Sequence, residues 1–252
     1  MEFTIFKNKN IISGISDISF GSIDPTPSDP KISKRESEER AIKFLKSLGC
    51  KNINSKDLVW AEQVFSSNVH LCQKKDSGRV IKNVDGLISN IPGQILVIIT
   101  ADCLPILIFD QKQKVVANLH GGRKCLLRGI IKNAIKKMIK NFRSQPKQIL
   151  VGIGPHIRKC HYWLREKTYQ ILKKTVFKKY FLKKKNKIYF DLTKLTLDEL
   201  LKSGIEKKNI ENCQICTYCS YQKYFSSRKE EEFPGIYKEK NPRFASFIGL
   251  KS

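Results

Sequence analysis

The stretch Ile-Thr-Ala-Asp-Cys-Leu-Pro-Ile-Leu-Ile-Phe-Asp, residues 99–110, decides the fold class because it joins two apolar runs through a brief polar break. The first run covers residues 94–100 and the second covers residues 104–109, lengths typical of buried strands rather than helices. Connections this short cannot hold a crossover between parallel strands. The sheet is therefore predicted to be mixed rather than purely parallel.

Strands and helices alternate on both sides of this stretch. The sequence predicts further strands at residues 57–72, 115–120, 148–153 and 244–250, and helices at residues 37–48, 124–141, 165–181 and 193–202. The helix at 124–141 has an apolar stripe made of Leu127, Ile130, Ile131, Ala134, Ile135, Met138 and Ile139. Residues 14–30, rich in Ser, Asp and Pro, are predicted to be a polar loop. We expect one layered α/β domain over residues 1–252.

Composition narrows the class of protein. Hydrophobic residues make up 40% of the 252 residues and charged ones 28%, which excludes a disordered or collagen-like chain. The longest apolar stretch, residues 95–109, is interrupted by Asp102 and is too short to span a bilayer. The first ten residues lack the basic and apolar regions of a secretory signal. We expect a soluble protein of the cytoplasm that does not bind membranes.

Positive charge is concentrated in one part of the chain. The formal net charge is +25, and residues 111–190 hold 23 Lys or Arg and a single acid, Glu166. Such a region could attract phosphate or nucleic acid, whose recognition tends to use Arg and interleaved aromatic rings. Of the 48 basic residues 38 are Lys, as expected when lysine fills solvated positions. We therefore expect the lysines at 173–187 to be exposed on a helix and the loop after it, and nucleic-acid binding is not favoured.

The cysteines near the C-terminus have a spacing typical of metal ligands. Cys213, Cys216 and Cys219 are each three residues apart, but no fourth thiolate follows them. A structural zinc site has four protein ligands, so Cys160 and His161 would have to complete the set through the fold. Sequence spacing alone does not favour a metal site here.

Reactive side chains also gather where the predicted strands end. Cys103 follows one strand, and His120 closes another just before Gly121, Gly122 and Lys124. A thiolate and an imidazole brought together are either zinc ligands or a nucleophile and its base. The glycines would let backbone N–H groups approach an anion at the start of a helix, where Lys124 adds charge. The alternative is a small core cysteine and a strand-end histidine with its hydrogen bonds satisfied.

The whole chain resembles one family through motifs that occur in the expected order. They are QVFSSNV (63–69), VDGLIS (84–89), ITADCLPILIFD (99–110), LHGG (119–122), IGPHIRKCHY (153–162), FDL (190–192), ICTYC (215–219), YFSSRK (224–229) and PRFASFIGL (242–250). The chain is thereby identified as similar to the YfiH family, also called laccase-domain or multicopper polyphenol oxidoreductase-like proteins. Members of this family are regarded as purine nucleoside phosphorylases. The chain lacks the His-rich ligand sets that several copper ions would need.

The resemblance implies a zinc ion bound by His, Cys and His, with the fourth position open to substrate. The second and third ligands correspond to Cys103 and His120, but the first corresponds to Phe65, which cannot bind a metal. His70 is nearby, yet five residues along a strand would place it on the opposite face. We therefore expect zinc to bind weakly or not at all.

Other positions also depart from the family pattern. The family's Trp and Arg after the ligand histidine are replaced by Arg123 and Lys124, which keeps charge but loses the guanidinium fork suited to phosphate. An Arg expected near residues 11–16 is absent, and Pro242-Arg243 replaces Gly-Arg. The motifs of the scaffold are kept while the expected metal site is altered.

Three functions follow from these observations. The resemblance implies phosphorolysis of adenosine, inosine, guanosine or methylthioadenosine, with adenosine deamination as a side activity. Cys103 and His120 would then lie at the centre, with Lys124 and Arg228 as phosphate-binding candidates. Phe65 favours the alternative of a non-catalytic nucleotide-binding or interaction protein. The basic region favours the further alternative of a nucleic-acid-binding protein. The resemblance also implies a homodimer.

Overall fold

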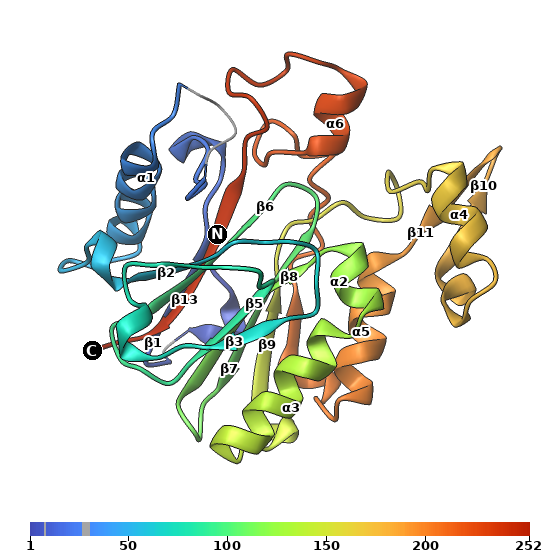
Figure 1. Ribbon diagram of the computed structural model, residues 1–252. Helices are drawn as coiled ribbons and strands as arrows, with labels where there is room; N and C mark the ends of the chain where they lie inside the picture. The colour runs from blue at the N-terminus through green and yellow to red at the C-terminus, as the bar shows by residue number, and fades with distance from the viewer. Residues whose placement is uncertain (8, 27–30) are drawn as a thin grey trace.

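Two β-sheets packed face to face form the centre of the computed structural model, which describes residues 1–7, 9–26 and 31–252 (Figure 1). The strands are β1 (Ile11–Ile15), β2 (Leu58–Ala61), β3 (Val69–Leu71), β4 (Val80–Ile81), β5 (Gly86–Ser89), β6 (Ile95–Thr100), β7 (Leu104–Asp110), β8 (Val115–Gly121), β9 (Ile149–Ile153), β10 (Phe181–Lys184), β11 (Lys187–Phe190), β12 (Ile210–Asn212) and β13 (Phe244–Leu250). The α-helices are α1 (Lys34–Ser47), α2 (Arg123–Leu127), α3 (Ile130–Phe142), α4 (Glu166–Leu172), α5 (Leu192–Lys202) and α6 (Ser227–Glu232).

Both sheets mix parallel and antiparallel pairs, so the predicted mixed-sheet α/β fold is confirmed. One sheet has the order β1-β13-β6-β2-β4, and the other has the order β12-β9-β7-β8-β5-β3. In the first, β13 is antiparallel to β1 and β6, whereas β2 is parallel to β6 and β4. In the second, β7 is antiparallel to both β8 and β9, whereas β3 is parallel to β5. β7 and β8 are buried along their whole length because the sheet is covered on both faces.

Helices cover the outer faces of the two sheets, which gives four layers (Figure 1). Helix α1 packs Ala41, Phe44 and Leu45 against the five-stranded sheet. Helices α2, α3 and α5 lie on the six-stranded sheet. A separate apolar cluster fills the space between the sheets. Within it the buried Asn118 of β8 donates to the carbonyls of Leu96 and Ser246, 3.1 and 2.9 Å away, and so joins the two sheets by hydrogen bonds.

The helix predicted at 124–141 is two helices in the structure. Gly129 has a φ of +80°, a left-handed conformation that interrupts the helix between α2 and α3. The apolar stripe is otherwise placed as expected, since Ile130, Ala134 and Met138 are buried, whereas Ile139 is 42% exposed. Apolar periodicity identified the buried face but not the break, because the pattern continues through Gly129.

Two other predicted elements are wrong in part. The helix expected at 165–181 ends at Leu172, and after a 3₁₀ turn the chain forms the β10–β11 hairpin, which projects from the body with α4 (Figure 1). The strand expected at 57–72 is two short strands, β2 and β3, which lie in different sheets and are separated by the loop 62–68. In that loop the backbone N–H groups of Val64 and Ser66 donate to the Asp85 carboxylate, and the Gln63 side chain bonds both backbone groups of Ile99 in β6.

The N-terminal loop and the lysine-rich segment also differ from expectation. Gly14 and Ile15, assigned to the polar loop 14–30, belong to β1, a 3₁₀ turn follows at Ile18–Phe20, and residues 27–30 lie outside the described residues. The lysines at 173–187 are all exposed, but several lie on the β10–β11 hairpin instead of a helix and its tail. Among the described residues, no helix is both long enough and apolar enough to cross a bilayer.

Candidate functional site

Cys103 and His120 face the same small space at one end of the β7–β8 pair. Cys103 directly precedes β7, and His120 lies in β8 opposite Pro105. A methyl group placed on Gly122 would lie 3.1 Å from His120 Nε2 and 3.4 Å from Cys103 Sγ. The antiparallel register of two buried strands therefore brings together the thiol and the imidazole named from the sequence. We call this pair the Cys103–His120 centre.

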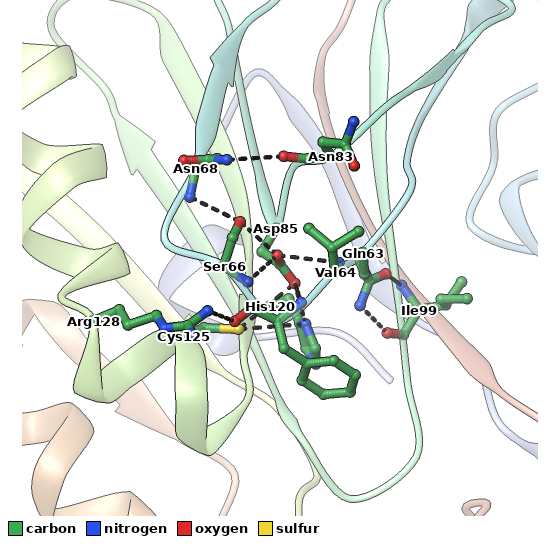
Figure 2. A network of polar contacts seen from close by, with 11 residues as sticks. Gln63, Val64, Ser66, Asn68, Asn83, Asp85, Ile99, His120, Cys125 and Arg128 are labelled. Carbon is green, nitrogen blue, oxygen red and sulfur yellow. Dashed lines mark hydrogen bonds and ion pairs between the residues drawn. The ribbon is translucent and has the colours of Figure 1, made fainter.

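A buried carboxylate holds the imidazole of His120 in place. Asp85 Oδ1 lies 2.7 Å from His120 Nδ1, and the Asp85 side chain is fully buried (Figure 2). Because the ionised carboxylate can only accept, Nδ1 carries the proton and Nε2 is turned toward Cys103. A carboxylate behind a histidine is the usual way in which proteins orient a metal-binding or proton-transferring imidazole.

The pKa shifts of Asp85 and His120 favour an ionised carboxylate beside a protonated imidazole. Burial acts to raise the pKa of Asp85, but the hydrogen bonds from His120 and Ser66 outweigh it and lower that pKa to about 2. Burial acts to lower the pKa of His120, but neighbouring Cys103 and the hydrogen bond to Asp85 outweigh it and raise that pKa well above its usual value. The protonated imidazole of His120 is therefore paired with the ionised carboxylate of Asp85 inside the centre.

Phe65 lies against His120, at the position where the family pattern has a histidine ligand. The two ring centroids are 5.1 Å apart, and Phe65 is 46% exposed. Its φ of +58° is left-handed, which is rare for a bulky residue. Asp85 Oδ1 accepts the N–H of Phe65 at 3.1 Å, and Arg128 Nη1 donates to its carbonyl at 2.8 Å. The surrounding polar groups thus fix the backbone and direct residue 65 at the imidazole.

His70 does not approach the Cys103–His120 centre. It lies in β3, and its Nε2 is 2.8 Å from Asp76 Oδ2. The expectation that residues 65 and 70 share one strand is wrong, because residue 65 is in the loop 62–68 and only residue 70 is in a strand. The side chain of His70 instead lines a separate hollow beside α3, with Asn133 and Lys136.

Sequence reasoning missed two residues that contact His120 of the Cys103–His120 centre, Asp85 and Cys125. Asp85 belongs to the motif VDGLIS (84–89), which was used only to identify the family. Cys125 is buried in α2, with its Sγ 3.6 Å from Asp85 Oδ1 and 3.7 Å from His120 Nδ1. A buried Asp in an apolar strand segment was the available signal for Asp85, whereas nothing in the spacing of Cys125 separates it from a core cysteine.

A cavity of about 450 Å³ opens beside the Cys103–His120 centre. Its lining combines apolar rings with charged side chains, and the residues are Asp24, Thr26, Ala61, Glu62, Gln63, Phe65, Ile99, Thr100, Ala101, Asp102, Cys103, His120, Ile157, Tyr162, Ser227, Arg228, Glu231 and Arg243. This size is within the range of small-molecule sites. A larger hollow of about 600 Å³ lies near the chain termini, but no histidine and no arginine are among its described lining residues.

The other predicted site residues have different positions. Arg228 lines the cavity, donates to the carbonyl of Trp163 at 3.1 Å and stacks on the Trp163 ring. Lys124 is exposed, does not line the cavity, and has its Nζ 6.0 Å from the centroid of the Phe65 ring. The anion role expected for Gly121 and Gly122 at the start of a long helix is weakened, because α2 has five residues. Gly121 is instead required by close strand packing, since a Cβ there would lie 2.8 Å from Leu104.

The donors at the Cys103–His120 centre do not fit a catalytic zinc ion. Such an ion has three protein ligands, and only Cys103 Sγ and His120 Nε2 face the shared space from the positions implied by the resemblance. The group Asp85, His120 and Cys125 also has convergent ligand atoms, but there Asp85 is occupied by Nδ1 of the same histidine. The phenyl ring of Phe65 fills the position of the missing donor.

Asp102 connects the cavity to the loops around it. Its Oδ1 accepts the Thr217 hydroxyl at 2.6 Å, its Oδ2 accepts the Arg228 N–H at 2.7 Å, and its carbonyl accepts the Ile157 N–H at 2.9 Å. Burial raises the pKa of Asp102. The residue before Cys103 therefore joins the β6–β7 turn to three distant segments that form the cavity wall.

Cys213, Cys216 and Cys219 do not lie together in one group. Cys216 and Cys219 converge with Cys160 and His161, whereas Cys213 is not in that group and packs against the core between the sheets. Sequence spacing alone did not favour a metal site at these three cysteines, and the structure brings only Cys216 and Cys219 of them together with other donors. The fold supplies the two further donors that sequence spacing could not.

Comparison with known proteins identifies similar chains. A family profile described as multi-copper polyphenol oxidoreductase laccase matches residues 31–251. A purine nucleoside phosphorylase of Clostridium acetobutylicum is 31% identical over 186 residues, which cover 72% of this chain and 75% of that protein. A purine nucleoside phosphorylase of Bacteroides thetaiotaomicron is 29% identical over 154 residues, which cover 60% of this chain and 57% of that protein.

Solved structures show the same fold. The crystal structure of YlmD from Geobacillus stearothermophilus superposes with a TM-score of 0.84 at 20% sequence identity, covering 99% of this chain and 94% of that one. At this identity the likeness concerns the arrangement of the chain and not its chemistry.

Proposed function

The chain belongs to the multi-copper polyphenol oxidoreductase laccase family, and from this premise we propose that it is a purine nucleoside phosphorylase-like enzyme whose reaction takes place in the cavity beside the Cys103–His120 centre. Relatives named purine nucleoside phosphorylase support a nucleoside-processing family. The observation that carries the proposal is the convergence of Cys103, His120 and Arg228 on one cavity large enough for a nucleoside.

The reaction requires one bond to form and one to break. An oxygen of inorganic phosphate attacks the ribose anomeric carbon while the bond from that carbon to the purine nitrogen breaks. The electron pair of the broken bond goes to the purine, which takes up a proton. The products are ribose 1-phosphate and the free base. Enzymes accelerate such a reaction by positioning the two reactants, stabilising charge and supplying the proton.

Residues of this chain match those three tasks. Arg228 and Arg243 bring positive charge to one side of the cavity, where phosphate would bind. The rings of Phe65 and Tyr162 line the cavity and offer apolar surfaces against which a purine would pack. His120, with its raised pKa and its orientation fixed by Asp85, would supply the proton to the leaving purine.

Turnover is expected to be slow, because the donor set does not fit the zinc ion implied by the family resemblance. We assign no step to a metal at this centre. Adenosine, inosine, guanosine and methylthioadenosine are the proposed substrates, and a proposed side reaction is hydrolysis of the adenine amino group to a carbonyl with release of ammonia. The alternative is a protein that binds nucleosides without converting them, and the Phe65 ring against His120 favours it.

The proposal is tested by measuring phosphate-dependent release of free base from each nucleoside by chromatography. We expect slow release that requires phosphate and that is lost in His120→Asn. His70→Asn is the matched control, because His70 also bonds a carboxylate but lies away from the cavity. Nucleoside binding by calorimetry with no release of base at high enzyme concentration would establish the non-catalytic alternative. Equal activity in wild type and His120→Asn would contradict the proposed role of the centre.

A further inference from the structure

Four metal-binding side chains from two distant loops meet outside the cavity. Cys160 and His161 lie in the loop after β9, and Cys216 and Cys219 lie in the loop after β12. One ligand atom from each of the four residues lies within 4.8 Å of all the others. Cys160 Sγ is 3.9 Å from Cys219 Sγ, and Cys219 Sγ is 3.3 Å from His161 Nδ1. We call this group the loop cluster.

The distances in the loop cluster match a single tetrahedral ion. With Zn–S bonds of about 2.3 Å and Zn–N bonds of about 2.1 Å, tetrahedral geometry puts two sulfur ligands about 3.8 Å apart and a sulfur and a nitrogen about 3.6 Å apart. A disulfide would bring the sulfurs to about 2.05 Å, much closer than the 3.9 Å between Cys160 and Cys219. The two distances, together with the 4.8 Å limit on all other pairs, are compatible with four donors to one shared ion.

Backbone contacts between the two loops hold the donors in this arrangement. The His156 N–H donates to the Ile215 carbonyl at 3.2 Å, and the Thr217 N–H donates to the His156 carbonyl at 3.1 Å, which forms a bridge beside Cys216. Arg158 Nη1 donates to the Gln214 carbonyl at 2.6 Å. The imidazole of His161 stacks on the ring of Tyr218, with centroids 4.0 Å apart and an interplanar angle of 13°. The cluster thus rests on loops that already pair with each other.

We propose that Cys160, His161, Cys216 and Cys219 bind one structural zinc ion. Three thiolates and one imidazole are the donors of a closed structural zinc site, and such soft ligands disfavour magnesium and calcium. All four coordination positions are filled by protein, so this ion leaves no place for a substrate. The site is separate from the Cys103–His120 centre and shares no residue with it.

The proposed ion would fix the wall of the cavity. Tyr162 and Trp163 directly follow His161, and Trp163 binds Arg228 through its carbonyl and its ring, 4.5 Å from the guanidinium carbon. Thr217 directly follows Cys216 and donates to buried Asp102. Zinc at the loop cluster would therefore hold the segment on which Arg228 rests against the segment that precedes Cys103.

Zinc content and a cobalt spectrum test this proposal. The protein is purified under reducing conditions, and its zinc is measured after gel filtration for wild type, Cys219→Ser and Cys160→Ser. We expect one zinc ion per chain in wild type and loss of most of it in both variants. Cys50→Ser is the matched control, since Cys50 is a partly exposed cysteine outside every convergent donor group of the described residues. Cys103→Ser should also retain the ion, which separates the two regions.

Cobalt substitution of wild-type protein keeps the test independent of variants that fail to fold. We expect the visible bands of tetrahedral cobalt together with thiolate-to-cobalt charge-transfer bands, and X-ray absorption of the zinc form should give three sulfur neighbours and one nitrogen. A wild-type chain that binds no zinc with its thiols reduced would overturn the proposal. So would unchanged zinc in Cys219→Ser, zinc lost only in Cys103→Ser, or an isolated Cys160–Cys219 disulfide under the same conditions.

Discussion

The Cys103–His120 centre and the loop cluster place metal-binding side chains in opposite ways. At the centre the donors are fixed by paired strands and a buried carboxylate, but the donor set is incomplete because residue 65 is Phe. The loop cluster has a complete set of four donors carried by loops, two of them exposed, with no carboxylate behind its histidine within hydrogen-bonding distance among the described residues.

The difference separates two ways of ordering metal-binding side chains, by the packing of strands and by the bound ion itself. Strand packing keeps Cys103 and His120 together even without the third donor, because His120 is buried in β8 and the partly exposed Cys103 directly precedes the paired strand β7. Loop donors have fewer buried contacts, so their order depends more on the ion they bind. The Cys103–His120 centre is thus preorganised but lacks one donor, whereas the loop cluster has all four donors and relies on the proposed ion for its order.

The largest effect is expected from restoring the missing donor. Phe65→His in a Cys219→Ser background should raise zinc affinity at the Cys103–His120 centre by more than the about 10–100-fold typical of residues that only orient a ligand. Phosphorolysis should rise with it. His also tolerates the left-handed backbone at residue 65 better than Phe. Zinc titration against a competing chelator measures the affinity.

The control for that variant is Phe65→Asn. Asn accepts a left-handed backbone but is a poor zinc ligand, so it separates relief of the backbone from gain of a donor. Equal zinc affinity in Phe65→His and Phe65→Asn would show that residue 65 is not a ligand position.

The second-largest effect is expected from removing Asp85, the carboxylate behind His120, which has no counterpart among the described residues at the loop cluster. Asp85→Asn added to Phe65→His should lower zinc affinity about 10–100-fold, because the orientation of His120 is lost. The same change removes the charge that accepts the N–H groups of Phe65 and Ser66. Stability should fall by about 1–3 kcal/mol, measured by denaturant unfolding. An unchanged affinity would mean that strand register alone orients the imidazole.

The third effect is the response of the two regions to removal of metal. A chelator should lower the melting temperature by about 5–10 °C, since a ligand at about 100 times its Kd contributes about 2.7 kcal/mol and each kcal/mol shifts a chain of this size by about 2–4 °C. Hydrogen exchange should accelerate in loops 156–163 and 214–220 and stay unchanged in β7 and β8. Uniform acceleration across both regions would contradict the contrast between them.

The smallest effect is expected far from both regions. Replacing Lys183, Lys184 and Lys185 by Glu on the β10–β11 hairpin should change stability by no more than about 0.5 kcal/mol and leave nucleoside release unchanged, because these side chains are exposed. Retention on duplex DNA should be weak in wild type and variant alike. Tight binding by wild type that weakens steeply with salt would restore the nucleic-acid hypothesis.

Local patterns in the sequence were sufficient to predict the helices and strands that bury an apolar face. The strand at 244–250 follows from an apolar run, and the inward face of α3 follows from helical periodicity. Both can be predicted because the residues that such an element buries are apolar and recur with the period of the element. The left-handed Gly129 and the β10–β11 hairpin did not follow, because their neighbours have the composition of a continuing helix.

The sequence by itself determined the mixed α/β class, the family, and the positions of Cys103, His120 and Phe65 in ordered motifs. Only the tertiary structure decided that Asp85 lies behind His120, that His70 is turned to Asp76, and that Cys160 and His161 meet Cys216 and Cys219 while Cys213 does not. The physical reason is that a site is made by side chains from segments far apart in the chain. Their convergence depends on strand register and loop pairing, which no local spacing encodes.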